Sequence, residues 1–257
     1  MKKRSYVLVI DIGNTSTSAG LYAAEKVTRV HRIETPELTR SSFDRFIGEV
    51  AGTRDIEGVS IASVVPSINT VLRRKLKRRV AGPILEVNHT LNLGVKITYP
   101  RPETIGADRL ANASAAVYRY RAPIIVADFG TALTFDVISH KDGYIGGVIC
   151  PGLPLMFSYL ADKTALLPHI KPGPVRHSVG KNTTEAMRIG ARWGYRGMVR
   201  EVLDHVGRNL GGGSYRICAT GGFAAWVLKG LDIPVSYDKD LTLFGLGRIY
   251  SWNASKS

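Results

Sequence analysis

The sequence predicts an alternating α/β protein built from two related halves. Short apolar runs rich in β-branched residues alternate with segments whose apolar residues recur at the helical period, a pattern typical of α/β folds. One hairpin pattern, an apolar strand followed by Asp-x-Gly, occurs twice. With 257 residues, 44% of them hydrophobic, the chain is long enough for one large domain or two domains of about 100 to 150 residues.

Five short runs have the composition of strands, and three longer segments have the pattern of helices. The predicted strands are residues 6–10, 59–65, 124–127, 145–149 and 215–218. The predicted helices are residues 104–120 and 184–209, together with a basic run at 73–79 that follows a cap signal at Asn69 and Thr70. Leu72, Leu76 and Val80 recur every four residues through that run, so we expect an amphipathic helix whose basic side chains face solvent.

The repeated hairpin divides the chain. Residues 7–22 (VLVIDIGNTSTSAGLY) and 123–138 (PIIVADFGTALTFDVI) share an apolar strand, Asp-x-Gly, a turn with Thr or Asn, and a second strand of alternating character. The two aspartates, Asp11 and Asp128, lie 117 residues apart, nearly half the chain. We therefore expect a duplicated domain, one copy in residues 1–116 and the other in 117–257, with a cleft between them.

Each Asp-Gly turn contains the groups that a phosphate site needs. Gly13 and Gly130 let the backbone approach a ligand closely, because glycine tolerates φ > 0. The N–H groups of the turns and the hydroxyls beside them can donate to phosphate oxygens; these hydroxyls belong to Thr15, Ser16, Thr17 and Thr131. A carboxylate in the same turn repels bare phosphate. Asp11 and Asp128 therefore favour a cation that lies between each carboxylate and the phosphate. One such turn is common without any ligand, whereas two in matching positions favour phosphate binding.

A second polar motif lies between the hairpins, in residues 97–116 (ITYPRPETIGADRLANASAA). Pro100 and Pro102 exclude a helix interior there, and the good helix formers from Thr104 onward place residues 106–109, Gly-Ala-Asp-Arg, on the first turns of a helix. Asp and Arg side by side at a helix start are either a solvated or capping pair or parts of a functional site. Their spacing alone does not separate these alternatives.

Charge and composition narrow the classes of function. The net charge of +14 raises nucleic acid as a partner, but a solvated helix face explains the densest basic run, and no zinc finger, RNP aromatic pair or helix-turn-helix spacing accompanies it. We therefore do not expect a nucleic-acid partner. Two cysteines are too few for a disulfide framework, and the six histidines lack the spacing of a zinc site.

The sequence also bears on location. It contains no uninterrupted apolar run of the roughly 18 to 20 residues that a membrane span needs. Its N-terminus has Asp11 and Asn14 where a signal peptide is apolar. We expect a cytoplasmic protein without a membrane partner.

The paired hairpins resemble those of the acetate kinase, sugar kinase, Hsp70 and actin superfamily, in which two ribonuclease H-like domains close on ATP. Tyr99 followed by Gly-Ala-Asp-Arg is similar to the signature of type III pantothenate kinases. Five more blocks match that family in order and spacing: DIGNTSTS (11–18), DFGTALTFDVI (128–138), GGVICPGL (146–153), GKNTTEAM (180–187) and ATGGFA (219–224). Leu133 and Cys150 depart from the residues that the family commonly has, and neither is a predicted site residue.

The resemblance implies an activity and roles for individual residues. The implied reaction transfers the γ-phosphoryl group of ATP to pantothenate, the first step of coenzyme A biosynthesis, with Asp108 as general base. The implied ATP contacts are Asp11, Ile12, Gly13, Asn14, Thr15, Ser16, Thr17, Ser18 and Thr131. The implied pantothenate contacts are Tyr99, Gly106, Ala107, Asp108, Arg109 and Thr183. The resemblance also implies Mg²⁺ near Asp11, a monovalent cation (K⁺ or NH₄⁺) on Asp128, and a homodimer.

Two other functions remain as alternatives. A different small-molecule kinase of the same superfamily would share both hairpins, but it has no reason to contain Tyr99 and the Gly-Ala-Asp-Arg run in this frame. A non-enzymatic regulator is the second, because members of the family have been described as accessory factors for virulence gene expression. Asp11, Asp108 and Asp128 argue against it, since a protein without catalysis has no physical need for three carboxylates around phosphate.

Overall fold

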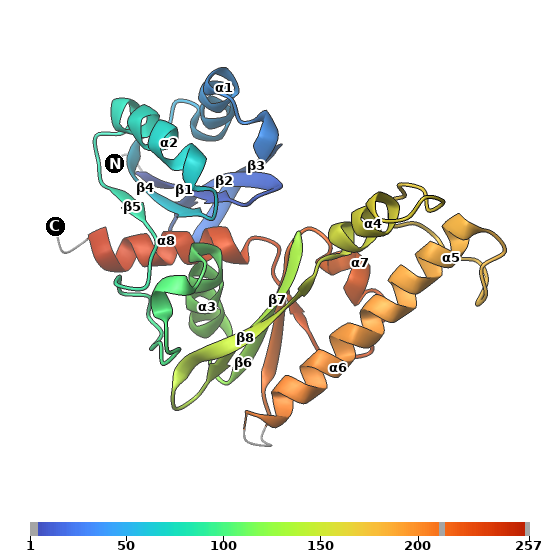
Figure 1. Cartoon of the computed structure of the whole chain (residues 1–257). Coiled ribbons are helices and arrows are strands. Elements are labelled where there is room, and N and C mark those ends of the chain that lie inside the picture. The colour runs from blue at the N-terminus through green and yellow to red at the C-terminus, as the bar shows by residue number, and fades with distance from the viewer. Residues whose placement is uncertain (1–4, 211–213, 255–257) are drawn as a thin grey trace. The chain divides into compact units, whose positions relative to one another are not determined.

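The computed structural model describes residues 5–210 and 214–254, and the chain divides into two compact units (Figure 1). Unit 1 comprises Met1–Arg121, Lys141–Ile145 and Asp240–Ser257, and unit 2 comprises Ala122–His140 and Gly146–Lys239. We predicted the boundary between residues 116 and 117. These two residues lie inside one helix of unit 1, α3 (Ala107–Tyr120), and the first segment of unit 1 ends at Arg121. The C-terminal helix, α8 (Leu241–Ala254), also belongs to unit 1 because its buried apolar side chains pack there.

Unit 1 is a five-stranded sheet with helices on both faces. Its strands are β1 (Tyr6–Ile12), β2 (Ser16–Ala23), β3 (Lys26–Glu34), β4 (Ile56–Ser63) and β5 (Ile84–Glu86), in the order β3-β2-β1-β4-β5. Its remaining helices are α1 (Arg40–Ala51), α2 (Pro66–Arg79) and two short 3₁₀ turns, Thr35–Glu37 and Pro102–Thr104. The β1–β2 and β2–β3 pairs are antiparallel, whereas β1–β4 and β4–β5 are parallel.

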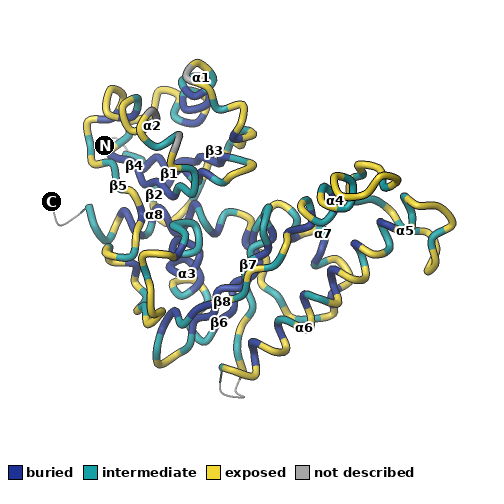
Figure 2. Tube along the Cα trace, viewed as in Figure 1, coloured by how far each residue is buried: buried dark blue, intermediate teal, exposed yellow. Residues whose placement is uncertain are grey.

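Side chains alternate between two apolar layers of this sheet. Leu8, Ile10 and Ile12 of β1 belong to one buried cluster with the apolar residues of α1 and α2. Tyr22 of β2 faces the opposite way and packs edge-on against Phe244 of α8, with 5.8 Å between the ring centroids. Figures 1 and 2 show α1 and α2 over one face of the sheet, α8 over the other, and a buried β1 between them.

Unit 2 repeats the strand arrangement of unit 1. Its strands are β6 (Ile124–Phe129), β7 (Ala132–Ser139), β8 (Gly143–Pro151, of which residues 143–145 belong to unit 1), β9 (Arg216–Thr220) and β10 (Ser236–Tyr237), in the order β10-β9-β6-β7-β8. Reversed, this order corresponds strand for strand to that of unit 1, with antiparallel β6–β7 and parallel β6–β9 and β9–β10 pairs. The predicted duplication is therefore confirmed at the level of topology.

The helices of unit 2 differ from the prediction in one respect. They are α4 (Leu153–Asp162), α5 (Thr183–Ile189), a π-helix (Gly190–Gly194), α6 (Tyr195–Arg208) and α7 (Ala224–Leu228). The single helix predicted over 184–209 is thus interrupted by the π-helix, which begins and ends at glycine.

Three predicted boundaries in unit 1 also change. The strand predicted to reach residue 65 ends at Ser63, because Pro66 starts α2 at its first turn. The basic helix therefore begins at Pro66, so Asn69 and Thr70 lie within it and do not cap it. The helix predicted from Thr104 begins at Ala107, after the 3₁₀ turn. Among the described residues, no helix is long and apolar enough to cross a membrane.

Candidate active site

The first hairpin holds its Asp-Gly turn at the end of β1. Asp11 pairs with Ser18 and Ile12 with Thr17, and the N–H of Gly13 donates to the carbonyl oxygen of Ser16 at 3.1 Å. Asn14 and Thr15 are exposed at the tip. The tip of the turn is therefore exposed at the surface, and the paired strands β1 and β2 hold it in place.

Two of the predicted ATP contacts face the interior. Ile12 is fully buried, and Thr17 is fully buried with its hydroxyl 3.0 Å from the hydroxyl of Thr35. The geometry therefore differs from the prediction that the Thr17 hydroxyl donates to phosphate, because strand alternation directs it away from the surface of the turn. These two residues support the turn from below.

Asp11 lies on the opposite face of the sheet, in one cross-strand row with Ser18 and Arg32. Asp11 pairs with Ser18, and Ser18 pairs with Arg32 of β3. The Arg32 guanidinium donates through Nε to the hydroxyl of Ser18 at 3.1 Å. A cationic side chain thus lies two strands from the Asp11 carboxylate on the same face.

Asp108 lies in the first turn of α3, as predicted. Gly106 is the N-cap residue, and no side chain caps the helix, so Asp108 does not fill the N-cap position. One carboxylate oxygen, Oδ1, accepts from the backbone N–H of Arg109 at 2.9 Å, whereas Oδ2 has no hydrogen-bond partner within the described part of the chain. A Cβ on Gly106 would lie 2.4 Å from Oδ1, so a side chain at position 106 would require the Asp108 carboxylate to move.

Tyr99 is placed by the segment that leads to α3. Its ring makes an edge contact with Tyr144, at 6.3 Å between centroids and 83° between planes, and it keeps 36% of its surface exposed. The neighbouring Thr98 N–H donates to the carbonyl oxygen of Tyr144 at 3.0 Å. Tyr99, Asp11 and residues 106–109 are therefore all in unit 1, with Gly106 close to Val64 just beyond the end of β4.

The second hairpin, in unit 2, has the same plan with a shorter turn. Asp128 pairs with Thr134, and the N–H of Gly130 donates to the carbonyl oxygen of Ala132 at 3.1 Å. Asp128 and its partner are six residues apart, whereas Asp11 and its partner are seven apart. Thr131 is half-buried at the tip.

Two glycines pack directly against this second turn. A Cβ on Gly152 would lie 2.0 Å from the carbonyl oxygen of Thr131, and a Cβ on Gly221 would lie 2.6 Å from Oδ1 of Asp128. Gly221 also has φ of +93°, which a residue with a side chain rarely adopts. The blocks around 151–152 and 220–221 therefore pack against the same turn as Asp128, although neither glycine is among the predicted contact residues.

The donors around Asp128 fit a hard or weakly hydrated cation. A carboxylate and the backbone oxygens of Gly130 and Thr131 are all oxygen ligands of the kind that such a cation takes, and glycine at 152 and 221 lets the backbone pack closely against them. In residues 5–210 and 214–254, no group of three or more His, Cys, Asp or Glu side chains gathers to hold a metal ion. Any cation at this turn would therefore have to take backbone oxygens as well as the single carboxylate.

Thr183 is the first residue of α5 and is exposed. Asn182 caps the helix by accepting from the N–H of Glu185 at 2.9 Å. Glu185 in turn accepts from the N–H of Lys181, and this bond together with the His177 ring lowers the pKa of the Glu185 carboxyl. Much of the GKNTTEAM block thus has a structural explanation, which leaves the hydroxyl of Thr183 at the surface.

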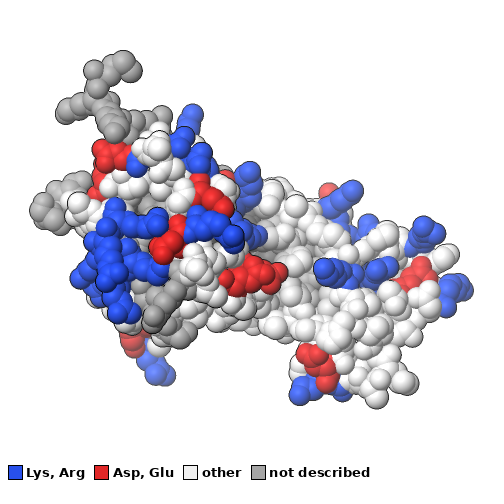
Figure 3. Space-filling view, turned by 90° about the horizontal axis from the view of Figure 1, so that it is seen from above, with Lys and Arg blue, Asp and Glu red and all other residues white. Residues whose placement is uncertain are grey.

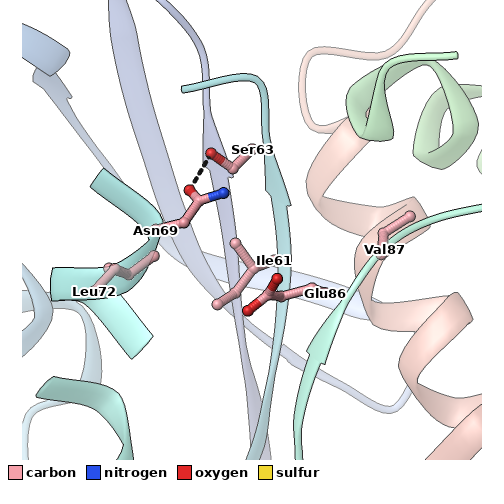
Figure 4. Close-up of a pocket in the computed structure, with 6 residues that line it drawn as sticks. All are labelled: Ile61, Ser63, Asn69, Leu72, Glu86 and Val87. Carbon is pink, nitrogen blue, oxygen red and sulfur yellow. Dashed lines mark hydrogen bonds between the residues drawn. The ribbon is translucent and has the colours of Figure 1, made fainter. Parts of the chain in front are cut away.

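The sheet of unit 1 also contains a small pocket away from the predicted residues (Figure 4). It has a volume of about 70 Å³ and is lined by Ile61, Ser63, Asn69, Leu72, Glu86 and Val87. The Ser63 hydroxyl donates to Oδ1 of Asn69 at 2.6 Å across it. No predicted site residue lines this pocket, and Ile61 and Leu72 place it on the face of α1 and α2.

Thr35 is a residue of the site that the sequence did not reveal. It is buried at the end of β3 and hydrogen-bonds to the first turn through both its backbone and its hydroxyl. The local sequence around Thr35 contains one signal, Pro36, which predicts the start of a turn. It does not predict that Thr35 contacts Thr15, 20 residues earlier in the chain.

Solved structures share this fold at low sequence identity. A Campylobacter jejuni protein described as a Baf family transcriptional activator has a TM-score of 0.57 at 18% identity, covering 95% of this chain and 97% of that one. A ROK family glucokinase from Streptomyces griseus, in complex with glucose and AMPPNP, has a TM-score of 0.50 at 15% identity, covering 98% and 100%. These likenesses show the fold alone. Two duplicated α/β units, each with an Asp-x-Gly turn after its first strand, place the chain in the fold class that these structures share.

Sequence comparison gives the family within that class. The family model described as type III pantothenate kinase matches residues 7–205. A type III pantothenate kinase of Akkermansia muciniphila is 41% identical over 240 residues, covering 93% of this chain and 96% of the relative. Another, from Methylacidiphilum infernorum, is 36% identical over 241 residues, covering 93% and 86%. The chain belongs to the type III pantothenate kinase family.

Proposed function

We propose that this chain phosphorylates pantothenate with ATP and that Asp108 accepts the proton of the attacking hydroxyl. Family membership makes the enzyme a pantothenate kinase and its reaction the first step of coenzyme A biosynthesis. The observation that supports Asp108 is its place in α3. It lies in the first turn without filling the N-cap position, with Gly106 making room for one oxygen and the other oxygen unpartnered in the described residues.

Phosphoryl transfer depends on positioning and charge stabilisation more than on covalent chemistry. When the hydroxyl oxygen attacks the γ-phosphorus, the bond from that phosphorus to the β–γ bridging oxygen breaks, and Asp108 takes the hydroxyl proton. Arg109 offsets negative charge or holds a substrate oxygen beside it. Tyr99, Gly106, Ala107 and Thr183 complete the proposed pantothenate contacts.

Each hairpin has a separate task with ATP. We assign the turn of residues 13–16 and Ser18 in unit 1, and Thr131 in unit 2, to hydrogen bonds with phosphate oxygens. Asp11 would hold Mg²⁺, and Asp128 with its neighbouring backbone oxygens would hold K⁺ or NH₄⁺. Bound there, these cations supply the positive charge that phosphates require.

The proposal extends to a cytoplasmic homodimer. Unit 2 exposes several large apolar side chains around β8, α4 and the π-helix: Ile149, Leu155, Tyr159, Leu166, Val179 and Trp193. Tyr159 keeps 66% of its surface exposed and Trp193 keeps 56%. Exposed apolar groups of this kind are typical of surfaces that another protein covers, and a second copy of the chain is the partner that the family favours.

An ADP-release assay with several phosphoryl acceptors tests the function. The purified protein is incubated with MgATP and KCl and with pantothenate, a simple sugar, acetate or glycerol. We expect turnover with pantothenate and only background ADP with the others, and mass spectrometry should identify 4′-phosphopantothenate. Turnover with a sugar but not pantothenate would support a different kinase, and no turnover with any acceptor would support a regulator.

A further inference from the structure

Thr35, directly after β3, makes two hydrogen bonds to the turn of the first hairpin and one to Thr17 of β2. Its hydroxyl donates to the carbonyl oxygen of Gly13 at 2.7 Å, and its backbone N–H donates to the carbonyl oxygen of Thr15 at 2.9 Å. A hydroxyl has one proton, so in the contact between Thr17 and Thr35 the Thr17 hydroxyl is the donor, at 3.0 Å. With 5% of its surface exposed, Thr35 makes these bonds out of contact with bulk water.

These bonds set the direction of two peptide planes in the turn. In a trans peptide the C=O and the following N–H point in opposite directions. Because the carbonyl of Gly13 is held toward Thr35, the N–H of Asn14 points away from it. Because the carbonyl of Thr15 is also held there, the N–H of Ser16 points away as well. The hydroxyl and the backbone of Thr35 thus each orient one donor.

We infer that Thr35 is a positioning residue for ATP, which aims the N–H groups of Asn14 and Ser16 at the phosphates. This inference rests on the proposed assignment of the first hairpin to ATP. Thr35 itself does not touch the nucleotide; it acts through the turn. Without Thr35, the carbonyl groups of Gly13 and Thr15 could rotate toward the surface of the turn. They would then take the place of the N–H groups and present partial negative charge to a phosphate.

Three variants separate this role from a structural one. Thr35→Val keeps the β-branched shape and the backbone N–H but removes the hydroxyl, and Thr35→Ser retains the hydroxyl. Thr35→Val alone leaves the buried Thr17 hydroxyl without its acceptor, which costs stability. The double variant Thr17→Val/Thr35→Val removes both hydroxyls and therefore tests the same role if the single variant folds poorly. Thr28→Val is the matched control, because Thr28 is on the strand that leads to Thr35 and donates to the carbonyl oxygen of Leu21, remote from the turn.

Calorimetric titration with MgATP in KCl, without pantothenate, is the direct measurement. We expect Thr35→Val and the double variant to bind MgATP about tenfold more weakly than wild type, the size of one net hydrogen bond. Thr35→Ser and Thr28→Val should stay within about twofold to threefold, which is less than one net hydrogen bond. In the full assay the KM for ATP should rise while the KM for pantothenate stays constant.

Several results would overturn the inference. One is affinity for MgATP within twofold of wild type in the double variant. Another is an equal rise of both KM values, or failure of Thr35→Ser to recover binding. If the wild type phosphorylates pantothenate and these variants bind normally, only the role of Thr35 is wrong. If the wild type binds no MgATP, the proposed function fails with it.

Discussion

Glycine and aspartate occur together at each of the three places where this chain presents a candidate catalytic carboxylate. Gly106 leaves space for Asp108, Gly221 leaves space for Asp128, and Gly13 follows Asp11 in the first turn. In the first two cases a Cβ would lie within 2.6 Å of a carboxylate oxygen, closer than atoms can approach. Glycine at these two positions therefore leaves the room that the carboxylate occupies, and a side chain there would require the carboxylate to move.

At this scale the decisive substitution is Asp108→Asn. The amide oxygen can still accept from the N–H of Arg109, so the start of α3 should persist, but the amide cannot take the hydroxyl proton. We expect kcat to fall by about 10² to 10⁴ with little change in MgATP affinity. Single-turnover and steady-state rates measure the effect, and Glu103→Gln, in the exposed 3₁₀ turn nearby, is the matched control. Near wild-type turnover with a normal melting temperature would exclude the catalytic role.

A second residue-scale prediction concerns the cation at Asp128. The surrounding backbone oxygens suit a weakly hydrated ion, so activity should need K⁺ or NH₄⁺ and fall sharply in Na⁺ alone. Rates are measured in each chloride at constant ionic strength. Asp128→Asn should lower activity in KCl and flatten the difference between ions. Equal rates of the wild type in all three salts would refute the cation role without affecting the kinase assignment.

Among the secondary-structure elements, α2 contains the densest run of basic residues, and its contacts bear on whether that charge serves a partner or only faces solvent. Leu72, Leu76 and Val80 are buried as predicted, and two acidic side chains take up part of the charge: Asp44 contacts Lys75 and Arg79, and Glu86 lies 3.6 Å from Arg73. Figure 3 shows lysines and arginines gathered over the part of unit 1 where α2 lies, and others spread over the rest of the visible surface. The helix is thus partly neutralised and otherwise solvated.

Replacing Arg73, Arg74, Lys77 and Arg78 by Gln should therefore leave catalysis intact. We expect specific activity within about threefold of wild type, since exposed charges each change stability by about 0.5 kcal/mol or less. Duplex binding is measured in parallel by fluorescence anisotropy at about 150 mM salt. A loss of turnover, or tight duplex binding that the substitution abolishes, would restore a nucleic-acid role.

The packing of α8 on α3 gives a prediction at the same scale. A Cβ on Gly245 would lie 2.0 Å from the carbonyl oxygen of Ala111, whereas a Cβ on Gly48 of α1 would meet nothing within 4 Å. Gly48→Ala should stabilise unit 1 by about 0.5 to 1 kcal/mol, because alanine restricts the unfolded chain more than glycine does. Gly245→Ala should destabilise it by about 1 to 3 kcal/mol, because the helices must separate. Urea unfolding of both variants measures the difference, and equal effects would contradict this packing.

For the whole molecule, the exposed apolar side chains of unit 2 predict self-association. Light scattering should give a mass twice the 28.0 kDa of one chain. Tyr159→Glu places a charge on that surface and should shift the protein toward monomer, because a buried unpaired charge is costly. Tyr237→Glu, at an exposed position on β10, is the control and should leave the mass unchanged. A wild-type monomer at micromolar concentration would exclude the stable homodimer.

The sequence by itself determined the repeated α/β plan, both Asp-x-Gly turns and the place of residues 106–109 at the start of a helix, because each depends on a short local pattern. These patterns are the period of the apolar residues, a glycine shortly after an aspartate, and a proline before a helix. Each is recognised within a few residues of sequence. The tertiary structure alone decided that α8 belongs to unit 1, that Thr17 faces inward to Thr35, and that Gly152 and Gly221 close around the second turn. The contacts of Thr17, Gly152 and Gly221 join residues from 18 to 93 positions apart in the chain, and the contact of Phe244 in α8 with Tyr22 joins residues 222 positions apart. They follow from which surfaces bury each other in the folded chain, and no local pattern specifies that choice.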